Sequence, residues 1–345
     1  MFDLKTIGLN DYWTKAFHNL PKDLDAGRIV TSYKKRIVVR TSHGDVEGEL
    51  SGQLQYAAQS SMDIPVVGDW VAVSRCGNKG LIRKIFPRRS VLVRKVSGKI
   101  FEKQVLAANI DVAFIVQGLD RDFNLNRLER YMTVIHSGLI FPVIILNKSD
   151  LLDTQSAEMA LDLVRKRFPE YRVFLTSAKI VQGVDALNAY LTPGLTFCLI
   201  GSSGVGKSSL INALAGDNIA QTGELSRSTS KGAHITTRRE LHILKNGSIL
   251  MDTPGLREIG IADAASGLEK TFPLIYDAAM YCRFDDCLHV NEPECAVKKA
   301  VEEGVLEERE FLNFLELRLE TEQFHKAVTE KERRKSDKKN PGRTS

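Results

Sequence analysis

The pattern of apolar and polar positions divides the chain into two kinds of structure. Short apolar runs occur at regular spacing at 36–40, 46–50, 66–73, 80–86 and 91–96, separated by Gly, Asp, Asn and Pro. This spacing predicts five short strands. The strands suit a small barrel, and an oligonucleotide-binding (OB) barrel is favoured because basic residues interleave with its last strands. An SH3-like barrel remains an alternative on sequence alone.

From residue 109 onwards, apolar strands alternate with helical stretches. The predicted strands lie at 111–117, 142–146, 172–176, 196–200, 239–244 and 248–251. This alternation is typical of a mostly parallel sheet covered by helices. After about residue 261 the chain becomes helical and polar, and Phe311, Leu315 and Leu319 mark one amphipathic helix.

A complete phosphate-binding motif follows the strand at 196–200. Residues 201–208 are Gly-Ser-Ser-Gly-Val-Gly-Lys-Ser, which match G-x-x-x-x-G-K-[ST], and a helical stretch follows them. The glycines let backbone N–H groups surround phosphate oxygens, Lys207 can reach the terminal phosphates, and the Ser208 hydroxyl can ligate Mg²⁺. The alternative is a chance glycine-rich turn, which the flanking strand and helix disfavour.

Two further motifs predict that the base of the nucleotide is guanine. Residues 147–150, Asn-Lys-Ser-Asp, follow the strand at 142–146, and residues 176–179, Thr-Ser-Ala-Lys, follow the next strand. The Asp150 carboxylate can accept from both N–H donors on guanine's Watson–Crick edge, while Asn147 can serve the N7/O6 side. Either motif alone is usually just a turn, but ATP-using P-loop proteins need neither, so the pair predicts GTP.

The magnesium ligands are expected around residues 252–255, Asp-Thr-Pro-Gly, which close the strand at 248–251. Asp252 is expected to hold Mg²⁺ through water, and the Gly255 N–H to contact the γ-phosphate. The polar stretch 222–237 contains Thr236, the candidate Mg²⁺-binding threonine, with Thr237 as the fallback.

The catalytic group is less clearly marked. Leu256 stands where many GTPases carry the glutamine that orients the attacking water, which predicts a slow intrinsic rate. His234 is the candidate replacement, although a loop histidine is more often simply exposed. The predicted catalytic residues are therefore His234, Lys207 and Thr236.

The cysteines indicate a metal site. Cys282, Cys287, His289 and Cys295 provide three thiolates and one imidazole, a set suited to one tetrahedral zinc ion per chain. Because all four ligands come from the protein, the site is predicted to be structural. Unlinked buried cysteines are the alternative, which the polar neighbours disfavour.

The charge is unevenly distributed. The net charge is +5, but residues 75–103 contain ten Lys/Arg against one acidic residue, and residues 326–343 contain eight against three. Solvated surface charge is the usual explanation of such runs. Two basic segments around a nucleotide-binding core favour a polyanion partner, with RNA the expected one.

The motif order carries a family resemblance. The guanine motifs precede the phosphate loop, whereas ordinary small GTPases begin with that loop. This rotation, with a barrel before it and a Cys₃His segment after it, resembles the bacterial ribosome small-subunit-dependent GTPase A (RsgA) family. The resemblance includes Pro-Val-Val-Gly-Asp-Trp-Val at 65–71 and the stretch 231–236. The family usually has Lys/Gly-Gly-x-His-Thr-Thr-Thr there, and this chain has Ala233 and Ile235 around His234.

The resemblance implies late maturation of the small ribosomal subunit. A member binds the subunit and its 16S rRNA, hydrolyses GTP faster there and then leaves. We therefore expect a multidomain protein with an N-terminal five-stranded OB-type β-barrel, a circularly permuted α/β P-loop GTPase domain and a mainly helical zinc domain. The expected boundaries are 1–33 for an N-terminal extension, 34–100, 105–262 and 263–330 for the three domains, and 331–345 for a basic disordered tail.

These expectations fix a set of site residues. The predicted GTP-binding residues are Asn147, Lys148, Ser149, Asp150, Ser177, Ala178, Lys179, Gly201, Ser202, Ser203, Gly204, Val205, Gly206, Lys207, Ser208, Ser209, Asp252 and Gly255. The predicted magnesium ligands are Ser208, Thr236 and Asp252.

No stretch approaches the roughly 20 apolar residues that span a membrane. We expect a cytoplasmic monomer with no membrane partner. The rival hypothesis is an RNA-binding adaptor that binds GTP structurally with little or no hydrolysis, motivated by Leu256 and the altered loop.

Overall fold

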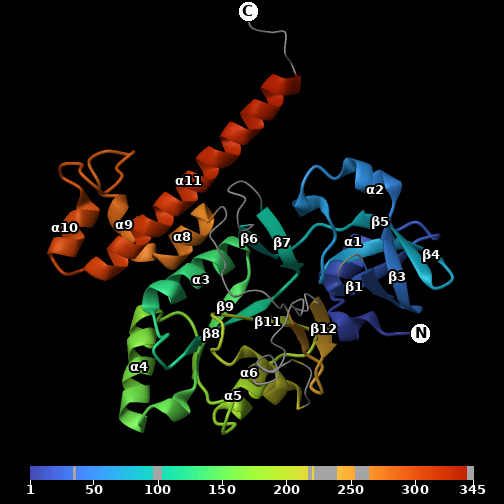
Figure 1. Ribbon diagram of the computed structural model, residues 1–345, viewed down its shortest axis with the longest axis horizontal. Coiled ribbons are helices and arrows are strands. Elements are labelled where there is room, and N and C mark those ends of the chain that lie inside the picture. The colour runs from blue at the N-terminus through green and yellow to red at the C-terminus, as the bar shows by residue number, and fades with distance from the viewer. Residues whose placement is uncertain (34–35, 96–102, 217–219, 221–238, 253–263, 340–345) are drawn as a thin grey trace, which may run out of the picture. The chain divides into compact units, whose positions relative to one another are not determined.

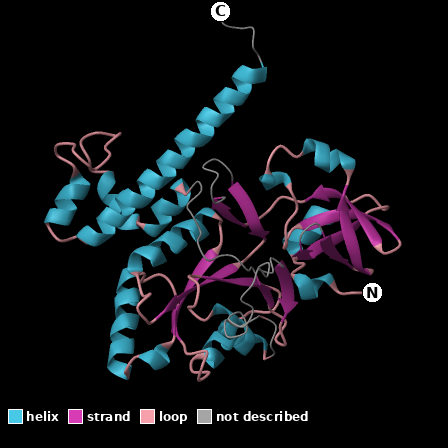
Figure 2. Cartoon of the chain, viewed as in Figure 1, coloured by secondary structure: helices cyan, strands magenta, loops and turns pink. Residues whose placement is uncertain are grey.

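The computed structural model describes residues 1–33, 36–95, 103–216, 220, 239–252 and 264–339. The chain forms two compact units. The first comprises Met1–Val93, Gln104–Asn124 and Leu139–Glu258, and the second comprises Arg94–Lys103, Leu125–Gly138 and Ile259–Ser345. In the described residues, most of the strands belong to the first unit and the second unit is mainly helical (Figure 2).

Five strands near the N-terminus form a closed barrel (Figure 1). They are β1 (Asp25–Tyr33), β2 (Arg36–Thr41), β3 (Gly44–Leu50), β4 (Trp70–Cys76) and β5 (Lys79–Ile85). The order is β1-β2-β3-β5-β4, and β4 returns to pair with β1. The β3–β5 pair is parallel and the other pairs are antiparallel. This order and the parallel pair are those of an OB-type barrel, as predicted.

Two expectations for the barrel were wrong: the place of residues 1–33 and the partner of the run at 91–96. β1 lies within the stretch 1–33, which we had set apart from the barrel. The run at 91–96, taken as the fifth barrel strand, is β6 (Val91–Lys95), which pairs with β7 (Lys103–Ala108) in a separate two-stranded sheet. Strand pairing is non-local, so a correctly recognised strand can still be given the wrong partner.

The N-terminal segment packs against the barrel. It contains a short 3₁₀ helix, η1 (Leu4–Ile7), and the helix α1 (Asp11–Phe17). The side chain of Asn10 caps the N-terminus of α1 by accepting from the Trp13 N–H. Trp13 lies 5.8 Å from Trp70 between ring centroids, and Phe17 lies 4.6 Å from Phe86. These rings form one apolar cluster, so residues before β1 complete the barrel core.

A second sheet follows the barrel in the chain, in the region predicted to be the GTPase domain, and is called the GTPase sheet below. Its strands are β8 (Val112–Gly118), β9 (Phe141–Asn147), β10 (Val173–Leu175), β11 (Thr196–Ile200), β12 (Arg239–Ile243) and β13 (Ile249–Asp252). The order is β10-β9-β8-β11-β13-β12, with every pair parallel except β12–β13. All six predicted strands are present within about one residue at each end. Every residue of β8 and β11 is buried, as expected of central parallel strands.

Besides η1 and α1, the described residues of the first unit form six further helices. They are α2 (Gly52–Ala57), η2 (Ser61–Asp63), η3 (Ser149–Leu151), α4 (Thr154–Arg167), α5 (Val184–Tyr190) and α6 (Lys207–Ala215). Asp153 caps α4 by accepting from the Ser156 N–H at 2.8 Å. Leu187 of α5 and Leu210 of α6 are fully buried in the apolar core of the sheet.

A buried arginine ties the barrel to the GTPase sheet. Arg28 of β1 is 2% exposed and donates to the carbonyl oxygens of Ile7, Gly68 and Asn109 and to the Thr196 hydroxyl. Burial lowers the pKa of its guanidinium to about 10, while Asp111 and Asp69 oppose that effect. The carbonyl contacts satisfy the N–H donors of this buried cation.

The second unit consists mainly of helices. They are α3 (Leu125–Ser137), α8 (Ala265–Thr271), α9 (Pro273–Ala279), α10 (Ala296–Glu302) and α11 (Glu308–Lys339). Gly267 lets α8 approach α3 closely, because a Cβ there would lie 2.0 Å from the Thr133 carbonyl oxygen. Helix α11 extends to Lys339, so the expectation of a disordered tail from 331 was wrong up to that residue. Glu, Lys and Arg are good helix formers, and extending an existing helix avoids the cost of nucleation.

Among the described residues, no helix is both long and apolar enough to cross a membrane.

Candidate functional site: a nucleotide site and a metal site

The phosphate loop connects β11 to α6, as the motif requires. Gly201, Gly204 and Gly206 have φ values of 145°, 82° and 96°, a region that favours glycine. A Cβ on Gly206 would lie 2.3 Å from the Asn147 amide nitrogen. The N-cap residue of α6 is Gly206, which has no side chain to cap the helix, and the N-terminus of a helix is a favourable place for a phosphate.

Lys207 is the first residue of α6, and its ammonium group folds back over the loop. Its Nζ donates to the carbonyl oxygens of Gly201 at 2.8 Å and of Ser202 at 2.5 Å. Ser208 and Ser209 follow in the first turn of the helix, and both are half-buried. The loop therefore places a cation and a hydroxyl group together at the C-terminal end of β11.

The Asn147 side chain joins three loops. It is 1% exposed, and its Nδ2 donates to the Val205 carbonyl at 2.8 Å. Its Oδ1 accepts from the Thr176 hydroxyl and from the Ala178 N–H, each at 3.1 Å. Both acceptor positions of Oδ1 are thus occupied, while the NH₂ group has a second hydrogen besides the one donated to Val205. Asn147 therefore fixes both guanine motifs against the phosphate loop and retains a hydrogen for an acceptor such as N7.

The other guanine-motif residues lie beside Asn147. Asp150 on η3 accepts from the Ser177 hydroxyl at 2.5 Å, and the Ser149 N–H donates to the Thr176 carbonyl at 3.1 Å. Lys179 follows them in the same loop and is exposed. The Asp150 carboxylate and the two motifs therefore form one continuous hydrogen-bonded surface.

Asp252 ends β13 at the same edge of the sheet. Burial raises the pKa of its carboxyl group; His242 opposes this effect and Glu240 adds to it. Glu240 lies directly opposite Asp252 in the β12–β13 register.

Three predicted site residues lie outside the described part of the chain. They are the catalytic and magnesium candidates His234 and Thr236, together with Gly255.

The arrangement defines a class of protein. The guanine motifs come before the phosphate loop in the chain, yet Asn147 hydrogen-bonds to Val205 within that loop. The loops of a P-loop GTPase site are therefore assembled from a rotated order of segments. The fold is that of a circularly permuted GTPase.

Comparison with known proteins identifies the family. The protein-family model described as RsgA GTPase matches residues 85–262 of this chain. The protein named Small ribosomal subunit biogenesis GTPase RsgA 1 from Bacteroides thetaiotaomicron is 41% identical over 320 residues, which cover 92% of this chain and 88% of the relative. A protein named Small ribosomal subunit biogenesis GTPase RsgA from Methanosarcina acetivorans is 42% identical over 285 residues, covering 82% and 76%. The chain belongs to the RsgA GTPase family, and the enzyme is a GTPase.

Solved structures share the fold. YjeQ from Thermotoga maritima superposes with a TM-score of 0.64 at 24% identity, covering 85% of this chain and 97% of that one. YloQ, described as a circularly permuted GTPase, gives a TM-score of 0.61 at 23% identity, covering 91% and 98%.

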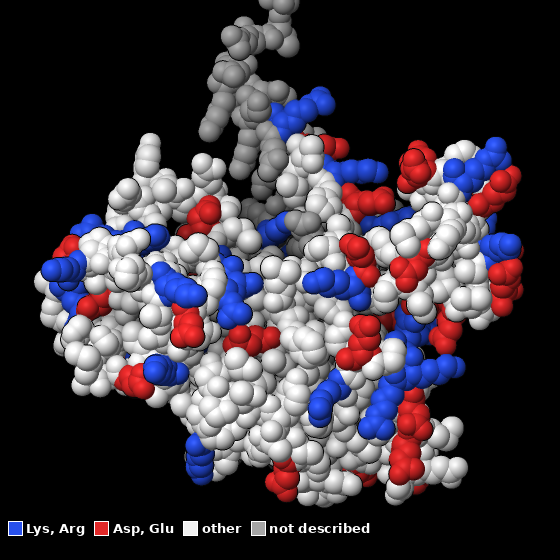
Figure 3. Space-filling model, turned by 180° about the vertical axis from the view of Figure 1, so that it is seen from behind, with Lys and Arg blue, Asp and Glu red and all other residues white. Residues whose placement is uncertain are grey.

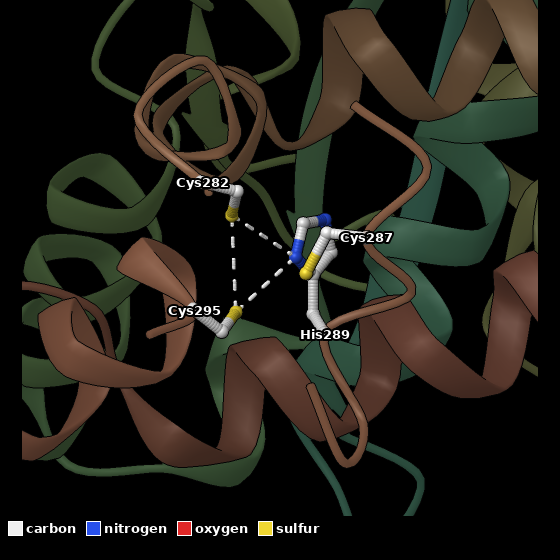
Figure 4. Close-up of side chains that lie close together, drawn as sticks. All are labelled: Cys282, Cys287, His289 and Cys295. Carbon is white, nitrogen blue, oxygen red and sulfur yellow. Dashed lines mark hydrogen bonds between the residues drawn. The ribbon is translucent and has the colours of Figure 1, made fainter. Parts of the chain in front are cut away.

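The second unit contains the predicted metal site. Cys282, Cys287, His289 and Cys295 turn toward a common centre (Figure 4), and their ligand atoms all lie within 4.8 Å of one another. The Cys282 Sγ is 3.6 Å from the His289 Nδ1 and 3.9 Å from the Cys295 Sγ. The His289 Nδ1 and the Cys295 Sγ are 3.4 Å apart. Tetrahedral zinc with bonds of about 2.3 Å to sulfur and about 2.0 Å to nitrogen gives edges of roughly 3.5–3.8 Å. The residues therefore fit zinc.

A carboxylate folds the loop that carries the histidine. Glu292 accepts from the N–H groups of Leu288, Val290 and Asn291 at 2.9–3.1 Å. The hydrogen bond from the Glu292 backbone N–H has the largest effect on the pKa of this carboxyl group. Together with the bonds from the three neighbouring N–H groups, it lowers the pKa to about 2. The turn gives His289 a φ of 62°, and through it the imidazole faces the cysteines. Zinc at this site would cross-link the segments around α9 and α10.

The basic segment predicted as an RNA-binding surface is partly structural. Arg88 forms a largely buried ion pair with Asp69 at 2.8 Å, and Lys79 pairs with Glu49 at 3.1 Å. Arg83 and Lys84 of β5 are exposed. On the face of the molecule in Figure 3, Lys and Arg side chains are interspersed with Asp and Glu. The sequence count therefore overstates the positive charge that is available to RNA.

Sequence reasoning missed one residue at the nucleotide site. Asp120 follows β8 and its Oδ2 lies 2.5 Å from the Lys148 Nζ. The available signal was its position after a predicted strand that is adjacent to the strand of the first guanine motif.

Proposed function

We propose that this chain is a GTPase of small-ribosomal-subunit biogenesis. In this proposal it binds the small subunit and its 16S rRNA as a cytoplasmic monomer, hydrolyses GTP faster there and then leaves. The observation that carries the proposal is the similarity, over 92% of the chain, to a relative whose name states this role. The hydrogen bonds of Asn147, which unite the guanine and phosphate loops, support GTP as the nucleotide.

The proposed roles follow from the position of each group. The N–H groups of the phosphate loop and Lys207 would bind the β- and γ-phosphates. Ser208 and Asp252 would hold Mg²⁺ with Thr236, and the Gly255 N–H would contact the γ-phosphate. His234 is proposed to orient the attacking water, since Leu256 cannot do so. One structural zinc per chain would be held by the Cys₃His cluster.

The pairing of β1 with β12 supports coupling between RNA binding and hydrolysis. Thr31 and Ser32 of the barrel pair with Glu240 and Arg239, which come directly after the stretch 221–238 that contains His234 and Thr236. A barrel that binds rRNA would therefore act on the strand that follows the proposed catalytic segment. Loss of γ-phosphate contacts on hydrolysis would weaken the same link and favour release.

The test is GTP turnover with purified ribosomal subunits. We expect small subunits to raise turnover by about tenfold or more, as accessory groups do for other GTPases. An equal response to large subunits, or no response, would contradict the proposal. Single-turnover measurement with small subunits present also tests the adaptor hypothesis, in which the bound GTP would stay intact.

Two variants test the roles within the site. Lys207→Ala should abolish tight nucleotide binding. His234→Ala should lower subunit-stimulated hydrolysis while leaving GTP affinity unchanged, and unchanged turnover would eliminate His234 as the group that orients water.

A further inference from the structure

We propose that Asp120 is a positioning residue of the guanine site, which anchors Lys148 so that the methylene stem of the lysine forms one wall for the base. The inference rests on GTP binding at this site and does not depend on the ribosomal partner.

The contact joins two neighbouring strand ends. Lys148 follows β9 and Asp120 follows β8, and these strands are parallel, with Gly118 opposite Asn147. The Lys148 Nζ donates to the Asp120 Oδ2 at 2.5 Å. To make this bond, the lysine stem must cross from the end of one strand to the end of the other. It does so at the edge of the sheet where Asn147 and Asp150 lie.

Asp120 is itself held in place. Its Oδ1 accepts from the Asp122 N–H at 2.9 Å, and the neighbouring Leu119 N–H donates to the Asn147 carbonyl at 2.8 Å. A Cβ on Gly118 would lie 3.2 Å from the same carboxylate, so glycine leaves room for it. The carboxylate is thus held by the Asp122 N–H, and the backbone next to it is held by the Asn147 carbonyl of the guanine motif.

The charge state suits this role. Burial opposes ionisation of Asp120, but the hydrogen bond from Lys148 and the N–H of Asp122 outweigh it, and the net effect is a lowered pKa of the carboxyl group. The carboxylate is therefore ionised at neutral pH, and it can pair with the ammonium throughout the physiological range.

The backbone of Lys148 adds a second constraint. Its φ of 65° and ψ of 36° place it in the left-handed region, at the start of η3. A free lysine side chain has considerable rotamer entropy. With the backbone fixed by the turn and the ammonium fixed by Asp120, much of that entropy is lost before the nucleotide binds. Preorganisation of this kind increases affinity.

A purely structural ion pair is the competing explanation. Both side chains are about one quarter exposed, at 28% for Lys148 and 26% for Asp120. Pairs with this much exposure usually contribute little to stability. The two explanations differ in what they predict for nucleotide binding, because a structural pair would change stability without a selective effect on the base.

The experiment compares the full-length protein with Asp120→Ala, Asp120→Asn and Asp120→Glu, without ribosomal subunits. Equilibrium affinities are measured for GTP and for inosine triphosphate, which lacks the 2-amino group that Asp150 reads. We expect Asp120→Ala to weaken both nucleotides five- to tenfold with their ratio unchanged, Asp120→Asn to weaken them less, and Asp120→Glu to restore most of the affinity. The KM for GTP should rise by a similar factor, and turnover at saturating GTP should fall by less than the affinity does.

Two control variants calibrate the result. Asp150→Asn should reduce the preference for GTP over inosine triphosphate, which Asp120 variants should not do. Asp162→Asn removes an exposed carboxylate of α4 that lies 4.0 Å from Arg165, and it should change neither affinity.

Unchanged affinity in Asp120→Ala would overturn the proposal. So would an equal fall in affinity and in turnover at saturation, which would indicate general damage to the site. If Asp120→Ala does not fold, the near-isosteric Asp120→Asn replaces it, and unchanged affinity in that variant would overturn the proposal equally. Because no ribosomal subunit is present, a failure of subunit stimulation leaves this test intact.

Discussion

Thr31 of the barrel lies directly opposite Glu240 of the GTPase sheet, and Glu240 lies directly opposite Asp252. The Thr31 hydroxyl donates to the Glu240 carboxylate at 3.4 Å. The three residues form one row across β1, β12 and β13. A single strand therefore separates the barrel from the carboxylate proposed to hold Mg²⁺, which is a short path between the proposed RNA-binding module and the proposed catalytic centre.

Thr31→Val should weaken communication along this row. Valine keeps the shape and the strand preference of threonine but removes the hydrogen bond. We expect basal GTP turnover within twofold of wild type and subunit-stimulated turnover lower by about threefold, the size of effect that one weak hydrogen bond supports. Thr14→Val in α1 is the matched control, because the Thr14 hydroxyl donates within its own helix, to the Asn10 carbonyl. Full stimulation in Thr31→Val would show that the hydroxyl has no part in coupling.

Local motifs made the GTPase domain predictable. The phosphate loop and both guanine motifs are contiguous segments after apolar strands, and their chemistry follows from residue type and spacing. Asp120 belongs to no such motif. Its proposed role depends on the β8–β9 pairing, which brings it to Lys148 from 28 residues away, and single-sequence patterns do not reveal pairings of this kind.

The barrel was only partly predictable, for a related reason. β1 buries four consecutive residues, 27–30, including Arg28, so it lacks the alternation that identifies a half-buried strand. Arginine is normally assigned to the surface. Here its buried charge is satisfied by carbonyl groups from distant parts of the chain.

Gly68→Ala should destabilise the first unit strongly. Gly68 has a φ of 93°, and a Cβ there would lie 2.0 Å from the Ala108 carbonyl oxygen and 2.9 Å from the Met251 Cε. Backbone strain and the clash together should cost about 3 kcal/mol or more, measured by chemical unfolding. Gly77→Ala is the control. Gly77 has a φ of 61° with open space around it, so only strain of about 1 kcal/mol is expected. Equal losses would refute the role of the close approach.

His136 should make the second unit less stable in mild acid. The imidazole is 5% exposed, and its Nδ1 lies 3.0 Å from the Thr271 hydroxyl oxygen. That hydroxyl donates to the Gly267 carbonyl, so the His136 Nδ1 is the donor of this bond. Burial, with a smaller contribution from Lys270, lowers the pKa of His136 to about 4.

The sign of the pH effect follows from the two states. Unfolded His136 has a pKa of about 6.5, so protonation favours the unfolded state as the pH falls from about 6.5 to about 4. Between pH values of about 7.5 and 5.5 this effect should cost about 1 kcal/mol, measured as the free energy of unfolding in urea. His136→Gln should show a smaller pH dependence by that amount. Because both proteins keep the cysteine cluster, acid loss of metal affects them equally. Identical pH profiles would argue against a buried neutral imidazole.

Removal of one metal ligand should disrupt the second unit and leave nucleotide binding by the first unit unchanged. Cys295→Ser replaces a 5% exposed thiolate ligand at the start of α10 with a poor zinc ligand. We expect metal analysis to give about one zinc per wild-type chain and much less in the variant, with loss of helical circular dichroism, because metal binding and local folding are linked. GTP affinity should stay within about twofold, since the phosphate and guanine loops belong to the other compact unit.

Cys76→Ser removes an exposed cysteine outside the cluster and should change neither the zinc content nor the GTP affinity. A full zinc equivalent in Cys295→Ser would contradict the four-ligand site.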